Sequence, residues 1–241
     1  WIPSSRFWFC LNGVAWYLSV QAFLYAIFPW LLAVLKKVDT RRLRCIAAAI
    51  FCAQFLFSFA IWKAGLSGKA IFYLTYLCPL FRAGDFAISC CMGCLYRSRK
   101  EERIPYGAFS LLELAAVLFS GGCFFIAARQ VGALGAVAFR YNVLFTPSAV
   151  LLVWLLAVGK GVISRLLSAK PFLWLAGLSP YGFLIHQVLI RYMELAANKL
   201  GLTAHPVVWT LTVFLLTLCL SSFYKALEHR VRKRHAKAAA R

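Results

Sequence analysis

Charged residues are scarce in this chain, and acidic residues are the scarcest of them. Of its 241 residues only 14% are charged and 63% are apolar, whereas a water-soluble domain has about 25% charged and about 45–50% apolar residues. This scarcity excludes an ordinary soluble globular protein. Several apolar runs reach the roughly 20 residues that a helix needs to cross a bilayer. The sequence therefore predicts an integral membrane protein whose first partner is the lipid bilayer.

The usual signatures of nucleotide and metal binding are missing as well. Neither a GxGxxG pattern nor a P-loop occurs, so no glycine-rich loop is expected to cradle a phosphate. Cys91 and Cys94 form a CxxC pair but lack the second pair of ligands that a zinc site needs. We expect no metal. The nine cysteines suggest no disulfide framework, because most of them lie within predicted spans, where cysteine behaves as a small apolar residue.

The charges that are present are strongly biased, since 27 Lys and Arg face 7 Asp and Glu and give a net charge of +20. Nucleic-acid binding is one explanation of such a bias. In a membrane protein the better explanation is that Lys and Arg gather in cytoplasmic loops and orient the spans. We therefore expect no nucleic-acid partner. The basic tail, 228–241, is expected to contact anionic lipid headgroups.

The apolar runs predict an all-α, polytopic bundle of about seven transmembrane helices, which we interpret as one membrane domain over 1–241. The predicted spans are 13–35, 44–62, 79–96, 107–128, 141–159, 180–198 and 207–226. The segment 64–78 is too short and too rich in Gly for another pair of spans, and we expect an external interfacial or re-entrant piece there.

Strongly basic segments follow every second predicted span. They are the loops 36–44, 97–103 and 160–170 and the tail after the seventh span. By the positive-inside rule these segments are cytoplasmic, which predicts an external N-terminus and a cytoplasmic C-terminus.

The sixth predicted span contains an unusual number of polar residues. Four of them fall within about 60° of one another at 100° per residue and form one stripe: Gln187, Arg191, Glu194 and Asn198. Arg191 and Glu194 have the spacing of an i,i+3 ion pair, which would lower the cost of charges within the membrane. His186 lies outside the stripe, in the cytoplasmic third of the span. Two roles stay open for it: a hydrogen bond to a neighbouring helix, or binding of a substrate or cofactor.

Other spans contain isolated polar groups. Gln21 in the first span either holds helices together or contacts a substrate. Arg82 and Asp85 are spaced for an ion pair near the outer surface, with a structural or a functional role. Glu113 is a membrane carboxylate with no partner evident in the sequence, which makes it a functional candidate.

Four segments, in this order, resemble the acyltransferase 3 family. They are "NGVAWYLSVQAFLYAIFPWLL" (12–32), "PLFRAGDFAISCCMGCLY" (79–96), "AKPFLWLAGLSPYGFLIHQVLI" (169–190) and "SSFYKALEH" (221–229). Each motif is loose by itself, but the resemblance covers essentially the whole chain.

The resemblance implies a ten-span O-acyltransferase of the cell membrane. Such an enzyme takes an acyl group, expected here to be acetyl, from cytoplasmic acyl-coenzyme A. It passes the group to a hydroxyl of a cell-envelope or exported polysaccharide, commonly at the external face. The residues that we expect along the substrate path are His186, Gln187, Arg191, Glu194, Gln21, Arg82 and Asp85. From the residues alone, a transporter or flippase for a glycan or anionic lipid and an inactive membrane subunit remain alternatives.

The chain departs from the family pattern at several positions. Many members have Glu where Gln21 stands, and a neutral amide cannot act as a base. Phe183 replaces a common Tyr, and no Pro follows Glu228. The family's catalytic His and a nearby Arg belong to its first span. We therefore expect the catalytic residue, and three further spans, to precede Trp1, and we expect this chain alone not to catalyse acyl transfer.

Overall fold

The computed structural model describes residues 14–99, 104–129, 137–201 and 205–239. Helices make up nearly all of these residues, and no β-strand occurs within the described ranges. The predicted all-α, polytopic fold class is confirmed. The chain divides into two compact units, one containing Trp16–Leu167 and the other Ser168–Arg241.

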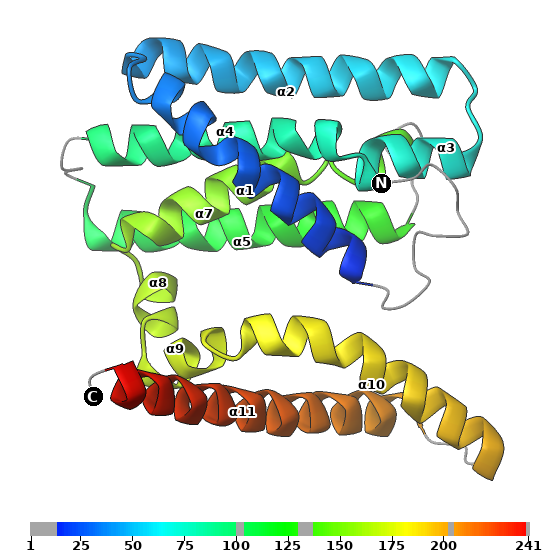
Figure 1. Cartoon of the computed structure of the whole chain (residues 1–241). Coiled ribbons are helices and arrows are strands. Elements are labelled where there is room, and N and C mark those ends of the chain that lie inside the picture. The colour runs from blue at the N-terminus through cyan, green and yellow to red at the C-terminus, as the bar shows by residue number, and fades with distance from the viewer. Residues whose placement is uncertain (1–13, 100–103, 130–136, 202–204, 240–241) are drawn as a thin grey trace. The chain divides into compact units, whose positions relative to one another are not determined.

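The first unit is a bundle in which α2 packs along α4 and α5 packs along α7 (Figure 1). Asp39 precedes α2 and accepts the N–H of Arg42 (2.9 Å), a standard N-cap. Pro79 occupies the first turn of α4, where its missing N–H costs nothing. The elements are α1 (Ala15–Leu35), α2 (Thr40–Lys63), α3 (Gly68–Phe72), the π-helical turn η1 (Tyr73–Leu77), α4 (Pro79–Ser98), α5 (Tyr106–Arg129), α6 (Val137–Arg140), α7 (Thr146–Val158) and α8 (Val162–Leu167).

The second unit consists of α9 (Lys170–Ala176), α10 (Ser179–Leu200) and α11 (Pro206–Ala239). α10 packs along α11, and Gly182 of α10 faces Ser221 and Thr217 of α11 at this contact. The axes of α9 and α10 differ by 58° across a short break.

Five helical stretches among the described residues are long and apolar enough to cross a bilayer, or six if α9 and α10 count as one bent span. The predicted span 141–159 differs most from the structure. Its helix, α7, has 13 residues and is about 20 Å long, short of the roughly 30 Å of a hydrocarbon core. The cause is a turn at 141–145 on one side and Gly159 on the other, whose φ of 74° ends the helix. The segment 64–78 forms α3 and η1, which lead directly into α4.

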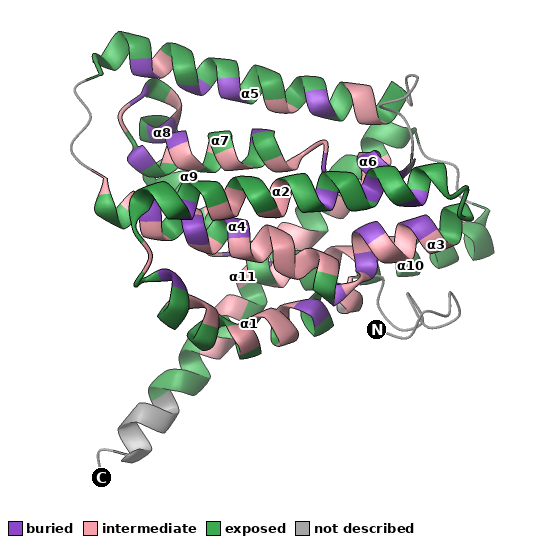
Figure 2. Cartoon of the chain, turned by 90° about the horizontal axis from the view of Figure 1, so that it is seen from above, coloured by how far each residue is buried: buried purple, intermediate pink, exposed green. Residues whose placement is uncertain are grey.

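Residue exposure follows the pattern of a lipid-facing bundle. Figure 2 shows many exposed residues along α2, α5 and α11, whereas α4, which packs against α2 and α7, is mostly buried or intermediate. In the first unit, the ends of α1, α4 and α7 and the start of α2, which border the basic loops, lie at one end of the bundle (left in Figure 1). This grouping agrees with the alternation of basic loops, and the chain is a multi-pass membrane protein. Which face of the membrane these loops occupy stays a prediction.

Candidate functional site

A polar network begins at the first turn of α4. The Arg82 guanidinium contacts the Asp85 carboxylate at 3.1 Å (Nη1–Oδ2), so the ion pair predicted from their spacing is confirmed. Arg82 also donates from Nε to the carbonyl of Tyr76 (2.8 Å), and its guanidinium lies over the Tyr76 ring at 4.8 Å. Because η1 ends just before α4, it places the carbonyl and the ring of Tyr76 next to the Arg82 guanidinium.

Two amide side chains from distant parts of the chain complete the network. Gln54 of α2 donates from Nε2 to Asp85 Oδ1 (3.2 Å) and to the Phe81 carbonyl (3.0 Å). Asn142, in the turn before α7, donates from Nδ2 to Asp85 Oδ1 (3.0 Å) and accepts from Arg82 Nη1 (3.1 Å). Asp85 therefore receives three donors. A carboxylate whose oxygens already accept this many hydrogen bonds suits positioning better than proton abstraction.

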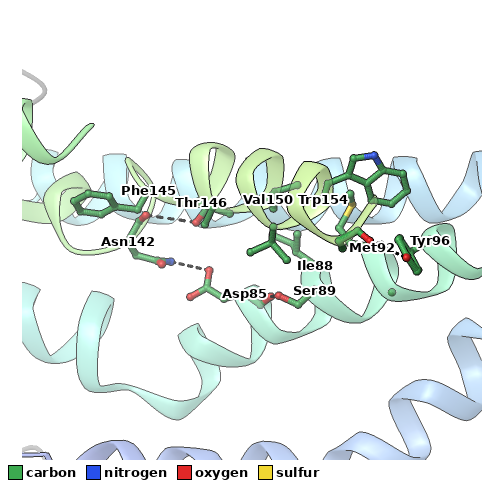
Figure 3. A pocket seen from close by; sticks show the side chains of 14 residues that line it. Asp85, Ile88, Ser89, Met92, Tyr96, Asn142, Phe145, Thr146, Val150 and Trp154 are labelled. Carbon is green, nitrogen blue, oxygen red and sulfur yellow. Dashed lines mark hydrogen bonds between the residues drawn. The ribbon is translucent and has the colours of Figure 1, made fainter. Parts of the chain in front are cut away.

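A cleft of about 510 Å³ starts at this network and runs between α4 and α7 (Figure 3). Asp85 and Asn142 line one end, and Tyr96 and Trp154 line the other. The Asp85–Tyr96 segment of α4 is about 16 Å long. The walls between are mostly apolar and include Ile88, Met92, Phe145, Val150 and Val153. We call this space the α4–α7 cleft.

Two cavities with basic lining residues share walls with the cleft, one of them at its Trp154 end. One, of about 610 Å³, shares Met92 and Trp154 with the cleft and is lined by Arg44 and Arg99. The other, of about 850 Å³, shares Ser89 and Gly93 with the cleft and is lined by Lys36 and Arg97. An elongated ligand with an anionic head and an apolar arm would fit this arrangement.

Glu113 has partners that the sequence did not reveal. It is fully buried in α5. Its carboxylate accepts the backbone N–H groups of Gly161 (3.1 Å), Ile163 (2.9 Å) and Ser164 (3.2 Å) at the start of α8. Backbone donors at a helix start have no partner within the helix. This side chain thus anchors α8, and the structure gives it a structural role.

The candidates on the sixth predicted span lie on α10. His186 is half-buried, and its Nδ1 lies 3.0 Å from the Gly182 carbonyl of the same helix, not a neighbouring one. Gln187 is half-buried, whereas Arg191 and Glu194 are exposed. Their spacing on α10 suits the i,i+3 pair expected from the sequence, and that pair stays a prediction. A place on the substrate path for these four residues stays a prediction.

Gln21 lies on α1 and is half-buried. Its Nε2 donates to the hydroxyl of Tyr25 one turn later (2.6 Å). It belongs neither to the polar network nor to the walls of the α4–α7 cleft. Its role in substrate contact stays a prediction.

Sequence reasoning missed Gln54 and Asn142. Gln54 stands alone in the apolar run "CAQFLF", and a buried amide in a membrane helix needs partners. That signal marks it as a candidate. Asn142 carries no such signal, since it lies in a turn where Asn is common. Among the described residues, no group of three or more His, Cys, Asp or Glu could hold a metal ion.

The family model described as "Acyltransferase domain" (Acyl_transf_3) matches residues 1–225. The chain belongs to the acyltransferase 3 family. No curated protein and no solved structure matches the chain. Two motifs of the family resemblance meet in the second unit, where the Tyr181 hydroxyl donates to the Glu228 carboxylate. A third contains Arg82 and Asp85, at the polar end of the α4–α7 cleft.

Proposed function

We propose that this acyltransferase 3 protein transfers an acyl group, acetyl in the simplest case, from acyl-coenzyme A to a hydroxyl of a cell-envelope or exported glycan. Family membership supports the acyl-transfer chemistry. The α4–α7 cleft supports the choice of donor, because a basic cavity borders its Trp154 end and the polar network lies at the other end. That arrangement is the single observation that carries the proposal.

The parts of coenzyme A and its acyl group match the basic cavity, the apolar walls and the polar network, in that order. Coenzyme A has anionic phosphates, which Arg recognises well because its guanidinium forms paired, charge-assisted hydrogen bonds. Arg44 and Arg99 line the cavity nearest Trp154 and would hold this end. The pantetheine arm and acyl group would extend along the apolar walls toward Asp85 and Asn142. The cleft volume of about 510 Å³ is within the usual range for small-molecule sites, about 300–1,000 Å³.

The polar network would position the acceptor. Asp85 and Asn142 face the cleft, and each offers an oxygen that can accept a hydrogen bond from a sugar hydroxyl. In the transfer, the hydroxyl oxygen attacks the thioester carbonyl, the hydroxyl proton goes to a base, and the coenzyme A thiolate leaves. Asp85 already accepts three hydrogen bonds and Glu113 is enclosed by backbone donors, so neither suits the role of that base.

Arg44→Gln should weaken donor binding. Arg44 would contact a phosphate of coenzyme A, and the loss of one charge-assisted contact is worth about tenfold in affinity. We expect the KM for acetyl-CoA to rise about tenfold, with the KM for the glycan unchanged. The assay is transfer of labelled acetyl groups in membranes from cells that express the complete coding sequence. Arg41→Gln is the matched control, since Arg41 is an exposed residue of the same helix that lines neither the cleft nor its adjoining cavities.

The same assay separates the proposal from its alternatives. An acyltransferase modifies the glycan only when acyl-coenzyme A is supplied. Movement of a glycan across the membrane without the donor would instead indicate a transporter. Equal donor KM values in the Arg44→Gln and Arg41→Gln variants would contradict the proposed placement of coenzyme A. They would not contradict the proposed acyl-transfer reaction.

A further inference from the structure

A separate charged cavity lies within the unit formed by α9, α10 and α11. It has a volume of about 670 Å³ and lies where α9 and the start of α10 meet the C-terminal half of α11 (Figure 1). Its charged or titratable lining residues come from one helix face, at spacings of three and four residues. These residues are Lys225, Glu228, His229 and Arg232, with Trp174 and Tyr181 opposite.

The single carboxylate of this cavity is already engaged. Glu228 accepts the Tyr181 hydroxyl at Oε2 and pairs with the Arg232 guanidinium at Oε1. Lys225 is half-buried and makes no hydrogen bond or ion pair with any residue that the structure describes. Its ammonium lies over Gly177, where any side chain would collide with it. Among the described residues, this cavity therefore holds a cation that no carboxylate or hydrogen-bond acceptor engages.

The position of Lys225 along α11 indicates what lies near it. The residues from 206 to 224 carry no charge and form a helical run of about 28 Å, close to the roughly 30 Å of a hydrocarbon core. Lys225 is the first charged residue after this run, so it lies at the boundary between hydrocarbon and headgroups. Trp174, with 52% of its surface exposed, is of a residue type enriched at this boundary. The most abundant anions at such a depth are lipid phosphates.

We propose that this cavity binds the phosphate of an anionic phospholipid headgroup. Lys225 and Arg232 contact the phosphate, and Tyr181 with Glu228 holds Arg232 in place. The Trp174 ring lies beside the glycerol region of the lipid. The site lies wholly within the second unit and is independent of the proposed acyl transfer.

The test is a titration of the purified protein in nonionic detergent with phosphatidylglycerol, followed by the shift in melting temperature. We expect phosphatidylglycerol to stabilise the protein more than phosphatidylcholine. Lys225→Gln should weaken the apparent affinity for phosphatidylglycerol about tenfold, since it removes one charge-assisted contact. Lys233→Gln, which removes an exposed charge from the same helix but outside the cavity, should leave the affinity unchanged.

A second variant tests the cavity itself. Ala226 is exposed and lines the cavity, so Ala226→Phe should fold, fill the space and abolish the same stabilisation with every charge intact. Equal stabilisation by the two lipids, or equal affinity in Lys225→Gln and wild type, would overturn the proposal. So would a Lys225-dependent shift produced by coenzyme A or inorganic phosphate but not by phosphatidylglycerol.

Discussion

Asp85→Ala should destabilise the protein by about 2–4 kcal/mol and abolish acyl transfer. The substitution removes the acceptor for Arg82, Gln54 and Asn142 at once, and these donors come from three separate parts of the first unit. Removing one partner of a partly buried pair leaves the other charge uncompensated, which costs more than the pair itself contributes. The measurement is the melting temperature of the detergent-solubilised protein by fluorescence-detected size-exclusion chromatography.

Asp39→Ala provides the comparison. Asp39 also pairs with an Arg three residues away, but the side chains of Asp39 and Arg42 are 61% and 83% exposed, against 27% and 19% for Asp85 and Arg82. Its loss should cost about 1 kcal/mol, as for an N-cap. In addition, Arg82→Met combined with Asp85→Leu should be more stable than Asp85→Ala, because no charge is left without its partner. Equal melting temperatures for Asp85→Ala and Asp39→Ala would refute a central role for the network.

Glu113→Ala should release α8 from α5. Three backbone N–H groups would lose a buried acceptor, and that of Gly161 keeps the hydroxyl of Ser164 (3.2 Å) as a partner. A buried donor without a partner costs about 1–3 kcal/mol, so we expect a loss of about 2–4 kcal/mol. Hydrogen exchange, read by mass spectrometry, should rise at 161–167 and stay unchanged in α2 and α4.

Two further variants sharpen this result. Ser110→Ala removes the hydroxyl that accepts only the N–H of Val162 (3.2 Å), and its effect should be clearly smaller. Gly161→Ala should resemble Glu113→Ala, because a side chain at Gly161 would occupy the space of the Glu113 carboxylate. Faster exchange throughout the first unit in Glu113→Ala would contradict a local anchoring role.

The all-α bundle could be predicted because the hydrocarbon core of a bilayer permits few backbone structures. Within hydrocarbon every backbone polar group must be satisfied internally, so a long apolar run becomes a helix. The predicted span 79–96 thus corresponds closely to α4 (Pro79–Ser98). The span 141–159 could not be predicted in the same way. Its apolar composition conceals a turn at 141–145, from which the Asn142 side chain makes hydrogen bonds with residues distant in the sequence.

The site could be predicted only where its contacts are local. Arg82 and Asp85 are three residues apart on one helix, and their pairing follows from helix geometry. Gln54 and Asn142 bind the same carboxylate from 31 and 57 residues away. A single sequence does not indicate which residues so far apart are in contact. The same applies to Glu113, whose hydrogen-bond donors lie about 50 residues later in the chain. These donors are backbone N–H groups, and a backbone group leaves no mark in the sequence because almost every residue has one.

The central claim is that the α4–α7 cleft holds the acyl arm of the donor, and photolabelling tests it most directly. The probe is a coenzyme A thioester with a diazirine in its acyl group, irradiated with membranes that contain the protein and mapped by mass spectrometry. The account predicts adducts on α4 and α7, around Met92, Val150 and Trp154, that excess acetyl-CoA prevents. Gly93→Leu should abolish them, since Gly93 lines the cleft and a side chain there meets open space, whereas Gly122→Leu, equally unhindered but outside the cleft, should not. Competable adducts confined to α10 or α11, or unchanged labelling in Gly93→Leu, would contradict it.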